Sequence, residues 1–148
     1  MKKILFFPVA FFVSATSFSQ ILDPVKWSYA SKRISDTEAV VLIKATMDKG
    51  RHIYSQTVPK DGPQPTSFSF NSNNGYKLKG KTNEPKPIIE FEKAFNMELG
   101  YFENSVVFQQ RIDLLASSPT VKGKVVYMAC NDTQCLPPEE VEFSIPIK

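Results

Sequence analysis

Apolar and polar residues alternate with a two-residue period through much of this 148-residue chain. One face of residues 39–47 carries Ala39, Val41, Ile43, Ala45 and Met47. Val40 and Leu42 make the opposite face apolar as well, which predicts a strand at the centre of a sheet. The same period recurs at residues 106–114 and 141–147, and no segment has apolar residues at the spacing of a helix face. The pattern therefore predicts an all-β fold.

Turn-forming residues divide the chain into several short segments of this kind. Further strands are expected at residues 25–34, 52–56, 66–70, 76–80 and 121–130. Hairpin turns are expected at residues 48–50, 71–75 and 116–119, which are rich in Asp, Asn, Gly, Ser and Pro. Strands at this spacing predict an antiparallel β-sandwich. Residues 57–65 and 82–104 are too long for simple turns and are expected to be functional loops.

The amino terminus has the three parts of a secretory signal. Lys2 and Lys3 precede an apolar run at residues 4–13, and small polar residues follow. This order predicts a signal peptide over residues 1–19, cleaved before Gln20. The apolar run is shorter than the ~20 residues of a membrane-spanning helix, although an uncleaved anchor stays an alternative. We therefore expect an exported, soluble domain over residues 20–148, without membrane insertion of the mature chain.

The charge of the mature chain is nearly balanced. Removing the predicted signal leaves 16 basic residues against 15 acidic ones, a net charge of +1. Lys77, Lys79 and Lys81 alternate, and we expect them on one solvated strand face. Neither feature favours binding to nucleic acid, for which a dense basic surface is typical.

Two cysteines, Cys130 and Cys135, are the only ones in the chain, and four residues separate them. Asn131 and Asp132 favour a tight turn between two strands, which would bring the cysteines to bonding distance. Strand alternation places Cys130 on the face opposite Tyr127, which predicts a thiol near the surface.

Three roles for this pair stay open from the residues alone. A structural hairpin disulfide would close a very short loop and contribute roughly 2 kcal/mol. A redox pair would exchange disulfides with a partner. A metal site would combine both cysteines with His52, and with Met128 for copper(I), although structural zinc usually needs four protein ligands. We expect no cofactor.

A longer stretch around the cysteines resembles a known family. The matching segments are VYMACNDTQCLPP at residues 126–138 and VEFSI at residues 141–145. They resemble the amino-terminal periplasmic domain of the thiol:disulfide interchange protein DsbD. Residues 49–56 with the loop at 61–63, and residues 92–108, resemble two further regions of that domain. The resemblance covers nearly the whole mature chain and implies an immunoglobulin-like sandwich with a reversible disulfide.

The resemblance also implies roles for individual residues. Cys130 and Cys135 match the redox pair, with Cys135 as the cysteine that links to a partner. Phe95 matches a cap aromatic that shields the pair until a partner docks, and Tyr54 matches an aromatic beside the active site. His52 is a second neighbour, at a position where some relatives have tyrosine.

A periplasmic thiol:disulfide exchange protein is the function that this resemblance implies. In the full-length relative, electrons pass from cytoplasmic thioredoxin through a membrane domain and a thioredoxin-like domain to this domain, which reduces oxidised exported proteins. The chain ends at Lys148 without those domains, so we expect a separate donor, a thioredoxin-like or DsbD-type membrane redox protein. The alternative is a non-catalytic exported β-sandwich binding module with a structural hairpin disulfide.

Overall fold

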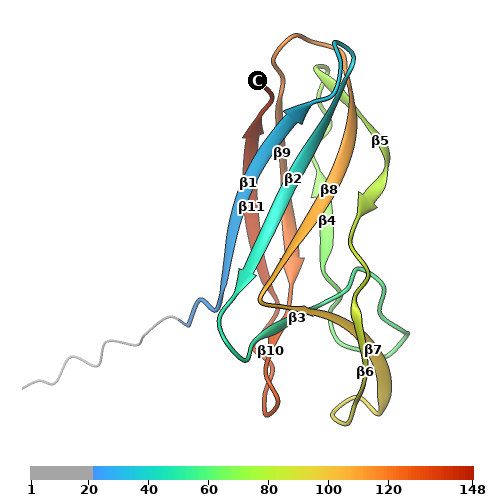
Figure 1. Ribbon diagram of the computed structural model, residues 1–148, viewed down its shortest axis with the longest axis vertical. Coiled ribbons are helices and arrows are strands. Elements are labelled where there is room, and N and C mark those ends of the chain that lie inside the picture. Colours follow the sequence, from blue (N-terminus) through green and yellow to red (C-terminus); the bar gives the residue numbers. More distant parts are fainter. Residues whose placement is uncertain (1–21) are drawn as a thin grey trace, which may run out of the picture.

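The computed structural model describes residues 22–148, so the predicted signal peptide at residues 1–19 lies outside the described residues. The described chain forms antiparallel strands in three sheets and contains no helix in residues 22–148 (Figure 1). Consequently, none of its described segments is a helix long and apolar enough to cross a membrane.

The first sheet forms one layer of a sandwich. In spatial order, its strands are β1 (Val25–Arg33), β2 (Glu38–Met47), β8 (Ser105–Leu114) and β5 (Tyr76–Asn83). β2 lies between β1 and β8, so the prediction of a central strand is confirmed. Its inward side chains, including Val41 and Ile43, are completely buried.

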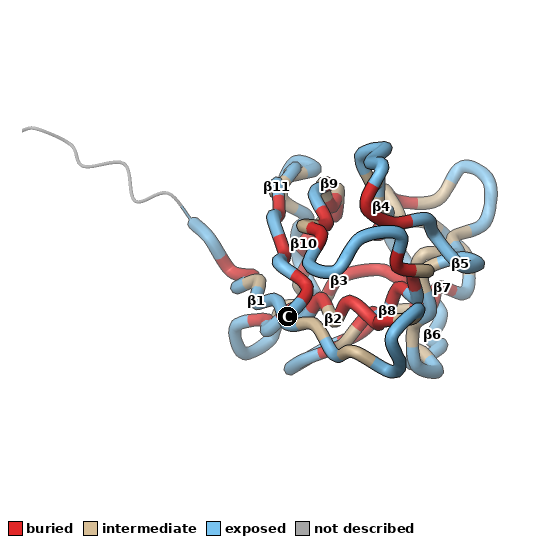
Figure 2. The backbone as a smooth tube through the Cα atoms, turned by 90° about the horizontal axis from the view of Figure 1, so that it is seen from above, coloured by how far each residue is buried: buried red, intermediate tan, exposed pale blue. Residues whose placement is uncertain are grey.

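The second layer covers this sheet. It consists of β11 (Glu139–Pro146), β9 (Thr120–Tyr127) and β4 (Ser67–Phe70). Aromatic rings bridge the two layers: the Trp27 ring lies 5.3 Å from the Tyr127 ring, and the Phe68 ring lies 4.9 Å from the Phe108 ring. Figure 2 shows buried positions on strands of both layers. The predicted all-β, immunoglobulin-like antiparallel β-sandwich is confirmed.

The third sheet closes one end of the sandwich, the lower end in Figure 1. Its strands are β10 (Ala129–Cys130), β3 (His52–Tyr54), β7 (Met97–Glu103) and β6 (Ile88–Glu92). Ile53, Phe102 and Ala129 project from one face into the main core. Tyr54 and Cys130 project from the other face and form a separate cluster. This sheet therefore anchors the candidate site directly to the core.

Two sequence predictions about connections are wrong. Residues 82–104 are predicted to be a loop, but they include the β6–β7 hairpin. The sequence did not reveal strand β6, because Ile88, Ile89 and Phe91 are all exposed and give no alternating pattern of burial.

The turns at residues 48–50, 71–75 and 116–119 are predicted to join hairpins. Each instead carries the chain from one sheet to another, because local turn chemistry reverses the chain without selecting the strand that pairs. The irregular loop at residues 57–65 is confirmed.

Candidate functional site

Cys130 and Cys135 form a disulfide across a tight loop at the end of β10. The Asn131 side chain holds the loop, since its Oδ1 accepts hydrogen bonds from the backbone N–H groups of Thr133 (3.0 Å) and Gln134 (2.8 Å). The Asn131 N–H in turn donates to the Gln134 carbonyl at 2.9 Å. The predicted turn over residues 131–134 is therefore confirmed, and asparagine serves it through local hydrogen bonding.

The predicted exposure of Cys130 is wrong. Its side chain is only 1% exposed, whereas Cys135 is exposed. The alternation used for the prediction stops at Met128, where the chain leaves β9 and joins β3 in another sheet as β10. One sulfur of the pair is consequently inside the protein and the other faces solvent.

Aromatic side chains lie beside the disulfide. Tyr54 is 1% exposed, and its hydroxyl lies 4.0 Å from the Cys135 Sγ. The Phe95 ring comes from the β6–β7 turn and meets the Tyr54 ring edge-on, with 6.2 Å between centroids. The Tyr54 carbonyl accepts a 2.5 Å hydrogen bond from the buried Thr66 hydroxyl, which fixes the backbone below the ring. Tyr54 and Phe95 are thus both beside the cysteines, as the resemblance implies.

His52 lies directly opposite Cys130 in the pairing of β3 with β10. Its ring packs against the rings of Tyr54 and Tyr101, at centroid distances of 5.3 and 5.0 Å. The His52 Nε2 atom is buried and has no hydrogen-bond partner among residues 22–148. A buried nitrogen without a hydrogen bond lowers the stability of the fold, so such atoms are uncommon in proteins and point to a role for the side chain.

Two small cavities flank these side chains. One, of about 190 Å³, separates the Phe95 turn from the cysteine loop and is lined by Tyr54, Glu92 and Cys135. The other, of about 200 Å³, is lined by Arg51, His52, Tyr54, Glu90, Glu92, Tyr101, Glu103 and Asp132, among others. Sequence reasoning missed this acidic group, because its members are distant in the chain. The register of β6 and β7 brings them together.

Burial controls the protonation of the ring side chains. Burial raises the pKa of Tyr54 to about 12, and the nearby Glu92 carboxylate adds to the effect, so the hydroxyl keeps its proton at neutral pH. Burial lowers the pKa of His52, while Glu92, Asp132 and Glu103 act in the opposite direction. Tyr54 is therefore a hydrogen-bond donor near the exposed sulfur, and His52 is a neutral imidazole beside the buried one.

The metal alternative has little support from this geometry. It requires both thiolates, which the disulfide joins to each other. In the described part of the chain, no group of three or more His, Cys, Asp and Glu side chains is arranged to hold a metal ion.

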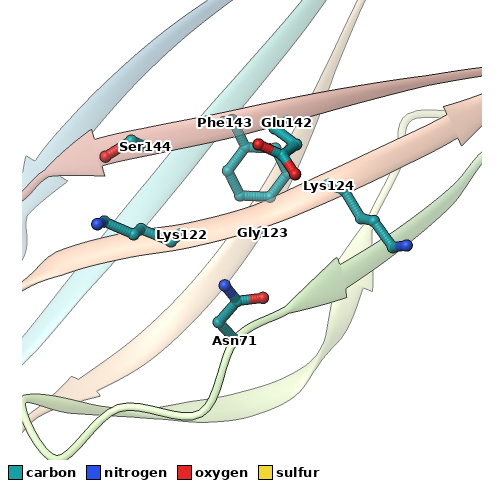
Figure 3. Close-up of a pocket in the computed structure, with 7 residues that line it drawn as sticks. All are labelled: Asn71, Lys122, Gly123, Lys124, Glu142, Phe143 and Ser144. Carbon is teal, nitrogen blue, oxygen red and sulfur yellow. The ribbon is translucent and has the colours of Figure 1, made fainter.

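A separate groove of about 420 Å³ lies on β9 and β11, away from the cysteines (Figure 3). Lys122, Lys124, Glu142 and Ser144 line it from the two strands. The ammonium group of Lys124 is 2.9 Å from Glu140 in an exposed ion pair. The groove has charges of both signs, and neither cysteine lines it, so it takes no part in the chemistry of the disulfide.

Comparisons with known proteins agree with this geometry. A family model described as the N-terminal part of the thiol:disulfide interchange protein DsbD matches residues 19–146. Among curated proteins, no similar sequence was found.

Three solved structures share the fold. The reduced DsbD N-terminal domain of Neisseria meningitidis is 15% identical, with a TM-score of 0.51 over 79% of this chain and 82% of that one. A complex of the DsbD and PilB N-terminal domains from the same species gives 15% identity and a TM-score of 0.55, over 84% and 87% of the chains. The N-terminal periplasmic domain of ScsB from Proteus mirabilis gives 12% identity and a TM-score of 0.59, over 85% and 47%.

The family model covers most of the chain, and the fold and the cysteine pair agree with it. The resemblance seen in the sequence is thereby confirmed: the chain belongs to the family of DsbD N-terminal domains, a thiol:disulfide interchange family.

Proposed function

We propose that this protein is a periplasmic thiol:disulfide exchange protein that passes reducing equivalents through Cys130 and Cys135 to exported partner proteins. The observation that carries the proposal is the unequal exposure of the two cysteines. A partner can reach Cys135, while Cys130 is held inside, next to it, where it can close the disulfide again.

The exchange needs two displacement steps. In the reduced protein, the Cys135 thiolate attacks one sulfur of a partner disulfide, forms a mixed disulfide and releases the other partner sulfur as a thiolate. The Cys130 thiolate then attacks the Cys135 Sγ, and the electron pair of the broken bond leaves with the partner's sulfur. The partner gains two electrons as a dithiol once protons are taken up, and the pair becomes a disulfide again.

Tyr54 and Phe95 take supporting roles in this proposal. The Tyr54 hydroxyl is placed to donate a hydrogen bond to the Cys135 thiolate, which would make that thiolate easier to form. Phe95 lies on the β6–β7 turn, across a small cavity from Cys135, so its ring narrows the approach that a partner takes to the exposed cysteine. His52 is the third neighbour, opposite Cys130.

Thioredoxin-like proteins and DsbD-type membrane redox proteins are the donors that we propose, with oxidised exported proteins as acceptors. A DsbD N-terminal domain with the same fold has been solved in complex with the N-terminal domain of PilB. That domain therefore binds another protein domain, which supports a protein partner for this chain.

The alternative is a binding module whose disulfide is only structural. Against it, the main core contains nineteen buried residues and neither cysteine. The disulfide belongs to a second, smaller cluster at one end of the molecule. A core of this size does not depend on a short loop closure that contributes roughly 2 kcal/mol.

Paired variants test the proposal. Cys130→Ser leaves the exposed Cys135 without its resolving partner and should accumulate a mixed disulfide with a thioredoxin-like protein. Cys135→Ser is the matched control and should accumulate little, because Cys130 is buried. A redox titration of the wild-type pair should give a potential above roughly −300 mV. A lower potential, together with no trapped complex in either variant, would contradict the proposal.

A further inference from the structure

The pairing of β3 with β10 brings His52 next to the cysteine that closes the disulfide. Cys130 and His52 are directly opposed in the register, so both side chains project from the same face of the sheet. In such a pair the β-carbons are roughly 4.5–5.5 Å apart. The chain has one histidine, and the fold leaves it half-buried, directly opposite Cys130 in the register of the two strands.

The buried Cys130 has a chemical problem that the exposed Cys135 does not have. It must lose a proton before it can attack the mixed disulfide, because the thiolate is the nucleophile. Burial in apolar surroundings disfavours that thiolate and keeps water away from the thiol. A neutral base within the protein would remove the difficulty.

His52 has the state and the free nitrogen that this role needs. Its Nε2 atom is buried and without a hydrogen-bond partner among residues 22–148 while Cys130 is in the disulfide. A disulfide sulfur has no proton to donate, whereas the reduced Cys130 has one. Burial lowers the pKa of His52, which keeps the imidazole neutral at pH 7 and able to accept a proton.

The surroundings of His52 would stabilise the charge that it gains. Titratable and charged groups from four elements surround it. They are Arg51 just before β3, Tyr54 on β3, Cys130 on β10, Asp132 in the loop after β10, Tyr101 and Glu103 on β7, and Glu90 and Glu92 on β6. Four of these groups are carboxylates and one is a guanidinium. An imidazolium formed during the reaction is therefore paired with negative charge on several sides.

We infer that His52 is a catalytic base for the second step of exchange: it accepts the Cys130 thiol proton as that sulfur attacks Cys135. The Cys130 electron pair forms the new S–S bond, and the bond between Cys135 and the partner breaks. The partner's sulfur leaves with that electron pair as a thiolate, and the proton on His52 passes to this thiolate or to water. This inference rests on the proposed function of the cysteine pair.

Reaction with 5,5′-dithiobis(2-nitrobenzoate) separates the two steps without any protein partner. The reduced wild-type protein attacks the reagent through Cys135 and releases one thionitrobenzoate, which leaves a mixed disulfide on Cys135. The attack by Cys130 then releases a second thionitrobenzoate. Stopped-flow absorbance measured against pH gives the rate of each release.

His52→Phe keeps an aromatic ring but cannot accept a proton. Glu98→Gln is the matched control, because Glu98 is an exposed carboxylate on β7 that does not line the cavity of His52. At pH 7 the second release should be about a hundredfold slower in His52→Phe, while the first release is unchanged. The difference should close only at pH values well above the ordinary thiol pKa of about 8.5, where even a buried thiol ionises without a base. Slowing of the second release by one constant factor at all pH values would mean a structural role for His52 and overturn the inference. An equal pH-dependent loss in Glu98→Gln would also overturn it, because the loss would then not be specific to the imidazole.

The wild-type protein provides a second measurement, independent of how the variants fold. Because the chain has a single histidine, its NMR resonances are assigned without ambiguity. In the reduced protein they should show a second inflection at the Cys130 thiol pKa, which the oxidised protein and reduced Cys130→Ser should lack. No such inflection would overturn the inference. A wild-type protein with no second release would instead refute the proposed exchange function itself.

Discussion

Replacing Tyr54 by phenylalanine tests how the site activates its exposed sulfur. The substitution removes one hydroxyl, which lies 4.0 Å from the Cys135 Sγ, and keeps the ring that packs against Phe95. Because the pKa of Tyr54 is raised to about 12, this hydroxyl is protonated wherever Cys135 titrates. It can therefore donate to the thiolate, and its loss should raise the Cys135 pKa.

The magnitude follows from the strength of that hydrogen bond. Bonds to charged groups contribute about 1.5–3 kcal/mol, and for a contact at the long limit we take about 1 kcal/mol. One pKa unit corresponds to 1.36 kcal/mol, so the Cys135 pKa should rise by about 0.7 unit. At pH 7 the thiolate fraction would then fall about fivefold. Intrinsic nucleophilicity rises with thiol pKa, so the exchange rate should fall only about two- to threefold.

Iodoacetamide alkylation against pH measures this pKa in a Cys130→Ser background, where Cys135 is the single thiol. Tyr127→Phe is the matched control, since it removes another buried phenol, whose hydroxyl donates to Glu139 at 2.8 Å. Tyr54→Phe should raise the Cys135 pKa and Tyr127→Phe should not. Equal Cys135 pKa values in Tyr54→Phe and the parent, or a lower value in Tyr54→Phe, would refute the reasoning.

Three further outcomes test the cap, the core and the disulfide. Phe95→Ala should speed reduction of the disulfide by dithiothreitol several-fold, since the ring lies over Tyr54 beside the reacting sulfur; an unchanged rate in stopped flow would contradict a covering role. Gly123→Ala would place a new methyl group 2.8 Å from the Phe143 ring and against the Ser69 carbonyl, so urea denaturation should show a loss of about 1–3 kcal/mol. Reducing the disulfide should lower Tm by no more than about 8 °C, because so short a loop contributes roughly 2 kcal/mol; a larger fall in calorimetry would favour a structural staple.

The strands of the sandwich were predictable because their burial is one-sided or complete. β2 and β8 alternate in sequence as they alternate in burial, so Ile43 and Phe108 could be placed in the core from the residues alone. β6 could not be found in this way, because Ile89 and Phe91 are exposed and the strand exists through its pairing with β7. Which sheet a strand joins depends on contacts between distant segments, and no local signal records them.

In the candidate site, too, local features were predictable from the sequence, and features that depend on distant segments were not. The tight turn between the cysteines was predictable, because Asn131 and its neighbours stabilise it locally. The burial of Cys130 was not, because it depends on an interruption at Met128 and on a strand more than seventy residues away. Predicting exposure by counting alternate residues assumes that a strand stays in one sheet, and that assumption fails at this site.

Strand β3 connects the main core to the disulfide for which we propose exchange chemistry. Its three residues alternate, so Ile53 enters the main core while His52 and Tyr54 face the cysteines. The core holds the β3 backbone, which in turn fixes the positions of the two ring side chains beside the cysteines. Of these two side chains, His52 is only half-buried and does not belong to the main core, so a change at that position should cost little stability. Residue 52 can therefore be a histidine in this chain without disturbing the packing of the main core.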